Sequence, residues 1–177
     1  MKRTILLIAC SMLAISINAQ SISQDYSVMK NASLTNNHET DGKKTLVMAI
    51  RMAGMMDTFE SEGPFTVFEP TDAALTNLPN EYRLNELIKP ENKQKLKDLI
   101  SYHVVKGDFK TKDLIELIKE NEGEATLETL SGNNLTLSLS YGNVRIKDQH
   151  GNISTVKKTD INSSNGVVHV VDKVLIP

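Results

Sequence analysis

The segment Asn165-Gly-Val-Val-His-Val-Val-Asp-Lys-Val-Leu-Ile-Pro177 contains a turn followed by a run of β-branched residues that ends at a proline. Asn-Gly is a strong turn former, and glycine can adopt a positive φ there at little cost. Valine and isoleucine favour strands because their branched side chains pack well on a pleated surface. The segment therefore predicts a closing β-strand over 167–176 that follows a tight turn.

An earlier segment, Gly63-Pro-Phe-Thr-Val-Phe-Glu-Pro-Thr-Asp-Ala-Ala-Leu75, has the same density of structural signals. It predicts a short strand over 65–68 that is closed off by Pro70. Thr71 is then well placed as the N-cap of a helix, with Asp72 in the first turn, where a carboxylate interacts favourably with the helix dipole.

The third dense segment is Leu99-Ile-Ser-Tyr-His-Val-Val-Lys-Gly107, which completes a helix predicted over 91–102. Its apolar side recurs at the spacing of one helix face: Leu96, Leu99, Ile100 and His103. His103 therefore lies at the end of an apolar face, which favours a buried histidine with one polar partner over a ligand or catalytic role.

The rest of the chain divides into a helical half and a strand-forming half. Helical spacing predicts helices over 43–54 and 111–119, with Thr111 or Lys112 ahead of Asp113 at the start of the second. After Gly123, runs with strand composition alternate with turns rich in Gly and Asn. These runs cover 125–130, 135–139, 144–147, 153–156 and 167–176. Helices followed by strands favour the α+β class over a repeating βαβ sheet.

Together, the three dense segments resemble the signature segments of the fasciclin-like domain family, in the order and spacing that this family shows. Residues 66–72 are similar to its Thr-Val-Phe-Ala-Pro-Thr-Asp motif, with Glu69 in place of alanine. Tyr102-His103 matches its Tyr-His motif, and 165–172 matches Asn-Gly-Val-Ile-His-Val-Ile-Asp with aliphatic exchanges. The resemblance covers 43–177, and its motif residues are Phe68, Pro70, Thr71, Asp72, Tyr102, His103, Gly132, Asn165, Gly166, His169 and Pro177.

The resemblance implies a fasciclin-like fold with a wedge-shaped β-sandwich core and several helices packed around it. Family members are extracellular or periplasmic adhesion or interaction modules, with no characteristic catalytic activity or cofactor. The histidine that corresponds to His103 helps to hold the core, and the aspartate that matches Asp72 is its implied partner. Because residues around the Tyr-His motif are linked to receptor adhesion in animal members, Thr71, Asp72, Tyr102 and His103 are the candidate binding residues.

The N-terminus has the layout of a secretory signal peptide: a basic start, an apolar stretch and a small residue at Ala19. We expect a signal peptide over 1–19, cleaved after Ala19, and a flexible polar leader over 20–42. The alternative is lipid attachment at Cys10, although too few apolar residues precede it for a usual signal core.

The charge and cysteine content exclude several classes of function. The formal net charge is −2, and loss of Lys2 and Arg3 with the signal peptide lowers it to −4. Scattered lysines on a mildly acidic chain do not form a nucleic-acid footprint, so we expect no nucleic-acid partner. The single cysteine, Cys10, leaves with the signal peptide, so we expect neither disulfides nor thiol chemistry. No second apolar span follows, and the mature chain is expected to be soluble.

Metal and hydrolase sites are not favoured. His169 alternates within the closing strand, so we expect it to face solvent or to take one hydrogen bond. There is no His-Glu-x-x-His motif, cysteine pair or calcium loop, and we expect no metal and no cofactor. Asp98, Ser101 and His103 have the residue types of a hydrolase triad, but they follow one another on one helix and point in different directions.

The leading hypothesis is a bacterial, secreted or periplasmic, non-catalytic module that binds a cell-surface protein or an envelope or matrix polysaccharide. Two alternatives stay open: an accessory subunit that docks onto a membrane complex of the envelope, and, more weakly, a hydrolase. One copy of the domain can bind a partner or self-associate weakly.

Overall fold

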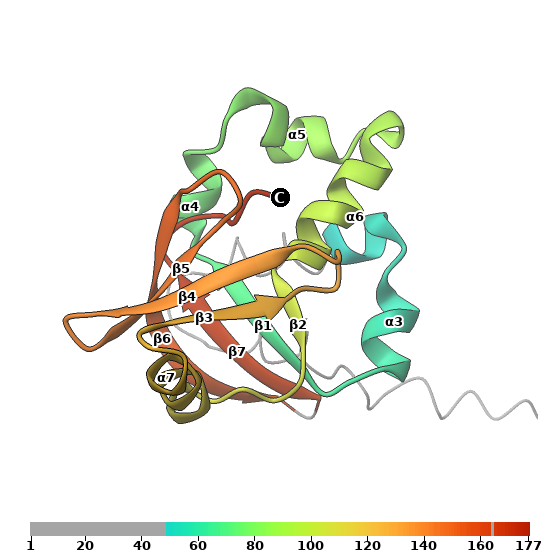
Figure 1. Cartoon of the computed structure of the whole chain (residues 1–177). Coiled ribbons are helices and arrows are strands. Elements are labelled where there is room, and N and C mark those ends of the chain that lie inside the picture. The colour runs from blue at the N-terminus through green and yellow to red at the C-terminus, as the bar shows by residue number, and fades with distance from the viewer. Residues whose placement is uncertain (1–48, 164) are drawn as a thin grey trace, which may run out of the picture.

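The computed structural model describes residues 49–163 and 165–177 (Figure 1). The expected signal peptide over 1–19, the expected leader over 20–42 and the start of the expected domain lie outside the described residues. Residues 49–53 are helical and belong to the helix expected over 43–54. None of the helices in the described part of the chain combines the length and apolar composition that a bilayer crossing needs.

The described helices are mostly short and come mainly before the strands, as the sequence predicts. The α-helices are α3 (Met56–Ser61), α4 (Asp72–Thr76), α5 (Leu84–Leu87), α6 (Lys93–Tyr102) and α7 (Thr111–Glu120). Two single turns of 3-10 helix, η1 (Asn80–Tyr82) and η2 (Pro90–Asn92), flank α5. The N-cap expected for α4 is confirmed, because the Thr71 hydroxyl accepts a hydrogen bond from the Ala74 amide at 3.2 Å.

The strands form one hydrogen-bonded series in the order β2-β1-β7-β6-β5-β4-β3. They are β1 (Phe65–Pro70), β2 (Val104–Lys106), β3 (Glu124–Glu128), β4 (Asn134–Ser140), β5 (Asn143–Lys147), β6 (Ile153–Ser163) and β7 (Gly166–Val171). Among the described strands, β1 and β7 are the one parallel pair, and every other neighbouring pair is antiparallel.

The sheet curls until its two edges meet. A β-bridge joins Val105, on β2, to Thr129, which follows β3. The Leu130 amide also donates to the Val104 carbonyl at 2.8 Å. The fold is thus α+β, with a strongly curved sheet and helices around it (Figure 1). The wedge-shaped sandwich outline stays an expectation.

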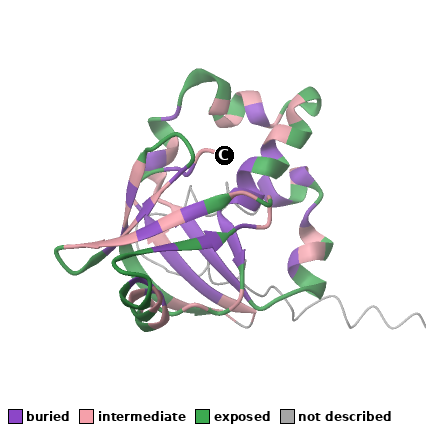
Figure 2. Ribbon diagram, viewed as in Figure 1, coloured by how far each residue is buried: buried purple, intermediate pink, exposed green. Residues whose placement is uncertain are grey.

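The residues of the parallel pair β1–β7 are almost all buried (Figure 2). Their side chains belong to two separate core clusters, one on each face of the pair. Side chains on a strand point alternately to opposite faces. Phe65 and Val67 accordingly pack with the helical cluster that contains Phe59, whereas Phe68 faces the second cluster. That second cluster lies inside the curved sheet and is covered by Leu114 and Ile118 of α7.

Some element boundaries differ from the predicted ones. The strand expected over 153–156 continues to Ser163, because β6 pairs with β7 beyond two irregularities of register. The closing strand ends at Val171 instead of 176, and the last residues are held by side chains instead of a neighbouring strand. The helix expected from Glu91 begins with a 3-10 turn and is α-helical from Lys93.

Candidate functional site

Strand β1 brings the three motif segments together. It pairs with β2, which follows the Tyr-His motif, on one side and with β7, the last motif, on the other. The Phe68 amide donates to the His103 carbonyl at 2.9 Å, and Phe68 lies opposite His169 in the parallel pair. Segments far apart in the sequence therefore form one structural unit.

Asn165 and Gly166 fix the start of this unit. The Asn165 side-chain amide donates to the carbonyls of Phe59 and Glu62, both at 2.8 Å, and so holds the end of α3. Gly166 has φ +132°, and a Cβ at this position would lie 1.8 Å from the Phe65 carbonyl oxygen. Only glycine allows the two parallel strands to approach this closely.

Tyr102 is fully buried and bridges two turns of the sheet. Its hydroxyl donates to the Asn134 carbonyl and accepts from the Gln149 amide, both at 3.0 Å. Burial raises the pKa of Tyr102 to about 12, and the nearby Asp148 charge acts in the same direction. Tyr102 therefore stays a neutral donor and acceptor throughout the physiological range.

His103 is buried and joins α6 to the C-terminal tail. Its Nδ1 lies 2.8 Å from the Leu99 carbonyl, and its Nε2 accepts from the Leu175 amide at 3.0 Å. An amide must donate, so Nε2 is the unprotonated nitrogen and the ring is the neutral Nδ1–H tautomer. Burial lowers the pKa of His103 to about 4, against the opposing effects of the Leu99 carbonyl and the Asp148 charge.

Two expectations for His103 and its neighbour need correction. Both ring nitrogens of His103 are engaged by backbone groups, so the implied pairing with Asp72 does not form. Tyr102 and His103 are 0% and 7% exposed, so a partner cannot touch them directly. Of the candidate binding residues, only Thr71 and Asp72 are partly exposed.

His169 is also buried, so of the two alternatives expected for it the solvent-facing one is excluded, and its ring is hydrogen-bonded instead. Its Nε2 lies 2.8 Å from the Phe109 carbonyl, and its Nδ1 accepts from the Asp160 amide at 3.4 Å. The ring stacks on Phe68 at a centroid distance of 5.8 Å. Burial lowers the pKa of His169, although the Phe109 carbonyl and the Asp160 charge oppose this shift.

Asp148 is a buried carboxylate that the sequence did not single out. Its Oδ1 accepts from the amides of His150 and Asn152, and its Oδ2 from the Asn152 side chain and the Ile176 amide. Four N–H groups thus satisfy a charge that would otherwise be costly to bury. The only sequence signal was the turn 149–152, because an aspartate before such a turn often binds its amides.

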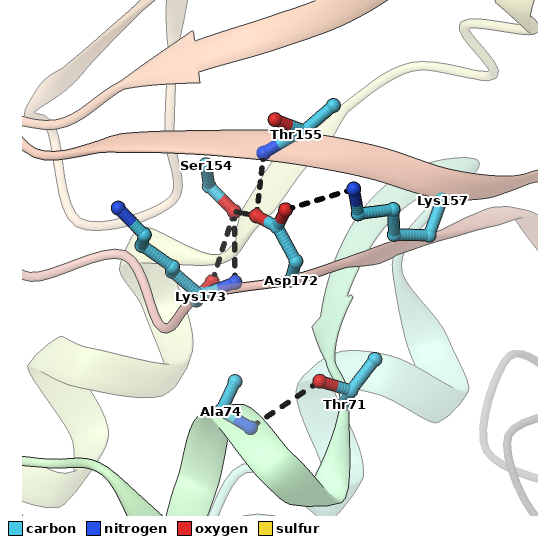
Figure 3. Close-up of polar contacts among 7 residues, drawn as sticks. All are labelled: Thr71, Ala74, Ser154, Thr155, Lys157, Asp172 and Lys173. Carbon is cyan, nitrogen blue, oxygen red and sulfur yellow. Dashed lines mark hydrogen bonds and ion pairs between the residues drawn. The ribbon is translucent and has the colours of Figure 1, made fainter.

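A group of polar residues surrounds Asp172 near the C-terminal ends of β1 and β7 (Figure 3). Asp172 Oδ1 accepts from the Thr155 amide at 2.7 Å and from the Ser154 hydroxyl at 3.2 Å. Its Oδ2 lies 3.1 Å from Lys157 Nζ. Burial would raise the pKa of Asp172, but these partners outweigh it and hold the pKa below its usual value.

This exposed end is built from segments distant in the sequence. The Thr71 amide donates to the Val171 carbonyl at 2.9 Å, which fixes α4 beside Asp172. Lys173 is exposed, and its amide donates to the Ser154 hydroxyl at 3.0 Å. The arrangement offers hydroxyl, carboxylate and ammonium groups for recognition, and the Ser154 hydroxyl is already engaged by Asp172 and by the Lys173 backbone.

Asp98, Ser101 and His103, which have the residue types of a hydrolase triad, do not form a hydrolase site. The Ser101 hydroxyl is buried against the Met55 sulfur at 3.8 Å, and Asp98 is hydrogen-bonded to Gln94 at the surface. Both ring nitrogens of His103 are hydrogen-bonded to other groups, the Leu99 carbonyl and the Leu175 amide. Within the ranges 49–163 and 165–177, no cluster of three or more His, Cys, Asp or Glu residues could hold a metal ion.

The other motif residues have structural positions. Phe68 is fully buried, Pro70 ends β1, and Gly132 has φ +81° in the turn between β3 and β4. Pro177 is partly exposed at the end of the tail. A separate open hollow of about 460 Å³ contains none of these residues, and is lined by Asn80, Glu81, Arg83, Asn85 and Glu86.

Comparison with known proteins identifies the same domain that the motifs and the fold indicate. A family model described as the fasciclin domain matches residues 41–177. Over 133 residues the chain is 38% identical to protein sll1483 of Synechocystis sp., covering 75% of this chain and 66% of that protein. It is 33% identical over 132 residues to the pig transforming growth factor-beta-induced protein ig-h3, covering 75% of this chain and 17% of that protein.

A solved structure shares the fold. The chain matches a FAS1 domain pair from the insect cell adhesion molecule fasciclin I with a TM-score of 0.58 and 18% identity. The match covers 75% of this chain and 44% of that one. The chain thus spans only part of the length of these relatives.

Proposed function

Because the chain belongs to the fasciclin domain family, we propose that it is a non-catalytic, extracytoplasmic module that binds a cell-surface protein or an envelope or matrix polysaccharide. The single observation that carries the proposal is the match of residues 41–177 to the model of this family. The likeness to a cell adhesion molecule supports it further.

The interior chemistry is consistent with a binding role. The groups that a catalyst would use, Tyr102, His103 and His169, are buried and engaged by backbone groups. Recognition must then use the surface, where α4 and the Asp172 network offer partly exposed polar groups. Export through the segment 1–19, with cleavage after Ala19, is part of the same proposal.

The test is a gene deletion, complemented either by the full chain or by a Ser101→Ala variant. We expect deletion to reduce surface attachment or cell aggregation and both complementing chains to restore it. Surface attachment that is unchanged by deletion of the gene would contradict the adhesion proposal. If Ser101→Ala failed to complement although it folds, the hydrolase alternative would gain support.

A crosslinked pull-down from envelope extract, with the chain from Gln20 onward as bait, distinguishes the binding module from an accessory subunit of a membrane complex. Binding to a surface protein or a polysaccharide fraction is the expected result. Recovery of one membrane complex at fixed stoichiometry would instead favour an accessory subunit.

A further inference from the structure

The turn between β4 and β5 contains an unusual residue. Tyr141 and Gly142 have φ of +48° and +79°, so the two-residue turn has a positive φ at both central positions. Turns of this kind prefer Asn-Gly, because a side chain larger than that of Asn or Gly is strained in the left-handed region. Tyr141 is nevertheless there, and its side chain is fully exposed.

Tyr141 is therefore unfavourable for the fold on two counts, backbone conformation and exposure of an aromatic ring. It is the one large hydrophobic side chain that is exposed among the described residues. The hairpin that presents it projects away from the body of the domain (Figure 1). A strained and exposed residue of this kind suggests a role in contact with another molecule.

The outer face of the same hairpin is polar. Leu135 and Leu137 of β4 and Val144 and Ile146 of β5 point into the core, so the alternate residues face solvent. These alternate residues and the tip form what we call the hairpin strip: Ser138, Ser140, Tyr141, Asn143, Arg145 and Lys147. From Asn143 to Lys147 the strip extends about 13 Å along β5.

Arg145 is at the centre of the strip and is partly exposed. Its cross-strand neighbours are Ser138 on β4 and Thr155 on β6. In the described part of the chain, the Arg145 guanidinium takes part in none of the ion pairs or side-chain hydrogen bonds. Lys147 has only a long contact with Glu124, at 3.9 Å.

The composition of the strip favours a polysaccharide over a protein as its partner. Protein interfaces have an apolar, aromatic-rich centre, whereas the strip has one aromatic ring among hydroxyl, amide and cationic groups. An unpaired guanidinium can bind a carboxylate through two parallel hydrogen bonds, in a bidentate geometry. Hydroxyl and amide groups can in turn bond to sugar hydroxyls.

We propose that the hairpin strip binds an acidic polysaccharide, with Arg145 on a sugar carboxylate and Tyr141 against a sugar ring. This proposal rests on the proposed binding function and names the class of partner. The charge of the unpaired Arg145 guanidinium favours acidic over neutral chains, whereas the Lys147 ammonium lies 3.9 Å from the Glu124 carboxylate and contributes less.

The test measures binding of the chain from Gln20 onward to polygalacturonate, with dextran as the neutral probe, at physiological salt. Arg145→Gln should weaken polygalacturonate binding about tenfold and Tyr141→Asn about fivefold. The matched control is Lys119→Gln, which removes one exposed positive charge from α7 and should change the affinity less than about twofold. The melting transition of each variant verifies that it is folded.

Several outcomes would overturn the proposal. An equal loss in Lys119→Gln would show non-specific charge attraction, and equal binding to dextran would exclude recognition of the acid group. If the strip variants retained polygalacturonate binding but lost a crosslink to one envelope protein, the strip would be a protein contact. Absence of polysaccharide binding, together with intact gene-dependent attachment, would end this proposal and leave the binding function standing.

Discussion

His103 joins three parts of the chain. Its carbonyl accepts from Phe68, its Nδ1–H donates to Leu99, and its Nε2 accepts from Leu175, a residue 72 positions later in the sequence. A lysine or arginine could not replace it, because the Leu175 amide needs an acceptor. This position therefore requires a neutral ring that has one hydrogen-bond donor and one hydrogen-bond acceptor.

His103→Ala should destabilise the domain by about 3 kcal/mol, because it removes packing and leaves a buried amide and a buried carbonyl without partners. The melting temperature should fall by about 10 °C. The control is His150→Ala, which alters an exposed loop side chain. Equal melting temperatures for the two variants would show that His103 does not support the core.

Gly166→Ala should be among the most damaging small substitutions, because the new Cβ would overlap the Phe65 backbone. We expect a loss of at least about 3 kcal/mol, or no folded protein at all. Gly151→Ala provides the comparison: it also has a positive φ, at +81°, but nothing lies near its Cβ. Since strain is common to both, a similar loss in both variants would contradict the close-approach argument.

At the scale of elements, the sequence predicted strands best where side chains alternate and one face is buried. Leu135 and Leu137 alternate with polar residues, and β4 lies where this pattern places it. The second half of β6 is almost entirely polar and exposed, so nothing in its composition reveals a strand. It forms because β7 offers backbone partners, and β2 likewise depends on β1.

The same limit applies to the candidate site. The motif residues were located, and their structural role was expected, but the partners of His103 and His169 are backbone groups from distant segments. Backbone groups carry no sequence signal. The burial of Tyr102 follows from the curl of the sheet, which a local pattern cannot show.

The β4–β5 hairpin should become more stable when its turn is relieved. Tyr141→Asn places a residue that tolerates positive φ at the strained position, and we expect a gain of about 0.5–1 kcal/mol. Thermal unfolding should then occur a few degrees higher. Tyr141→Phe is the control, because it keeps the strain and should leave the melting temperature unchanged; a lower temperature for Tyr141→Asn would refute strain in the turn.

At the scale of the whole molecule, the C-terminal tail closes the fold through polar contacts. Leu175 is fully buried and bound to His103, while the Ile176 amide is bound to Asp148. Tyr102, next to His103, bonds to the Gln149 amide beside Asp148. Helix α6, the β5–β6 turn and the C-terminal tail are therefore held together by one connected, buried polar cluster. Protonation of a group in this cluster would weaken the contacts of all three segments.

This cluster makes the stability of the domain depend on pH in a defined direction. An unfolded histidine has a pKa near 6.5, whereas burial lowers the pKa of His103 to about 4. Between these values the unfolded chain binds more protons than the folded chain, so stability must fall as the pH decreases. The difference amounts to on the order of 3 kcal/mol for His103, and His169, whose pKa is also lowered, acts in the same direction.

Urea unfolding at pH 7, 6, 5 and 4.5 should therefore show a progressive loss of unfolding free energy. This interval lies above the range in which Asp160 and Asp172 become protonated, because the pKa of each is held below its ordinary value. His103→Ala should be less stable at pH 7 but lose less stability on acidification. A wild-type stability that stays level or rises from pH 7 to 4.5 would mean that the buried histidines are not held neutral.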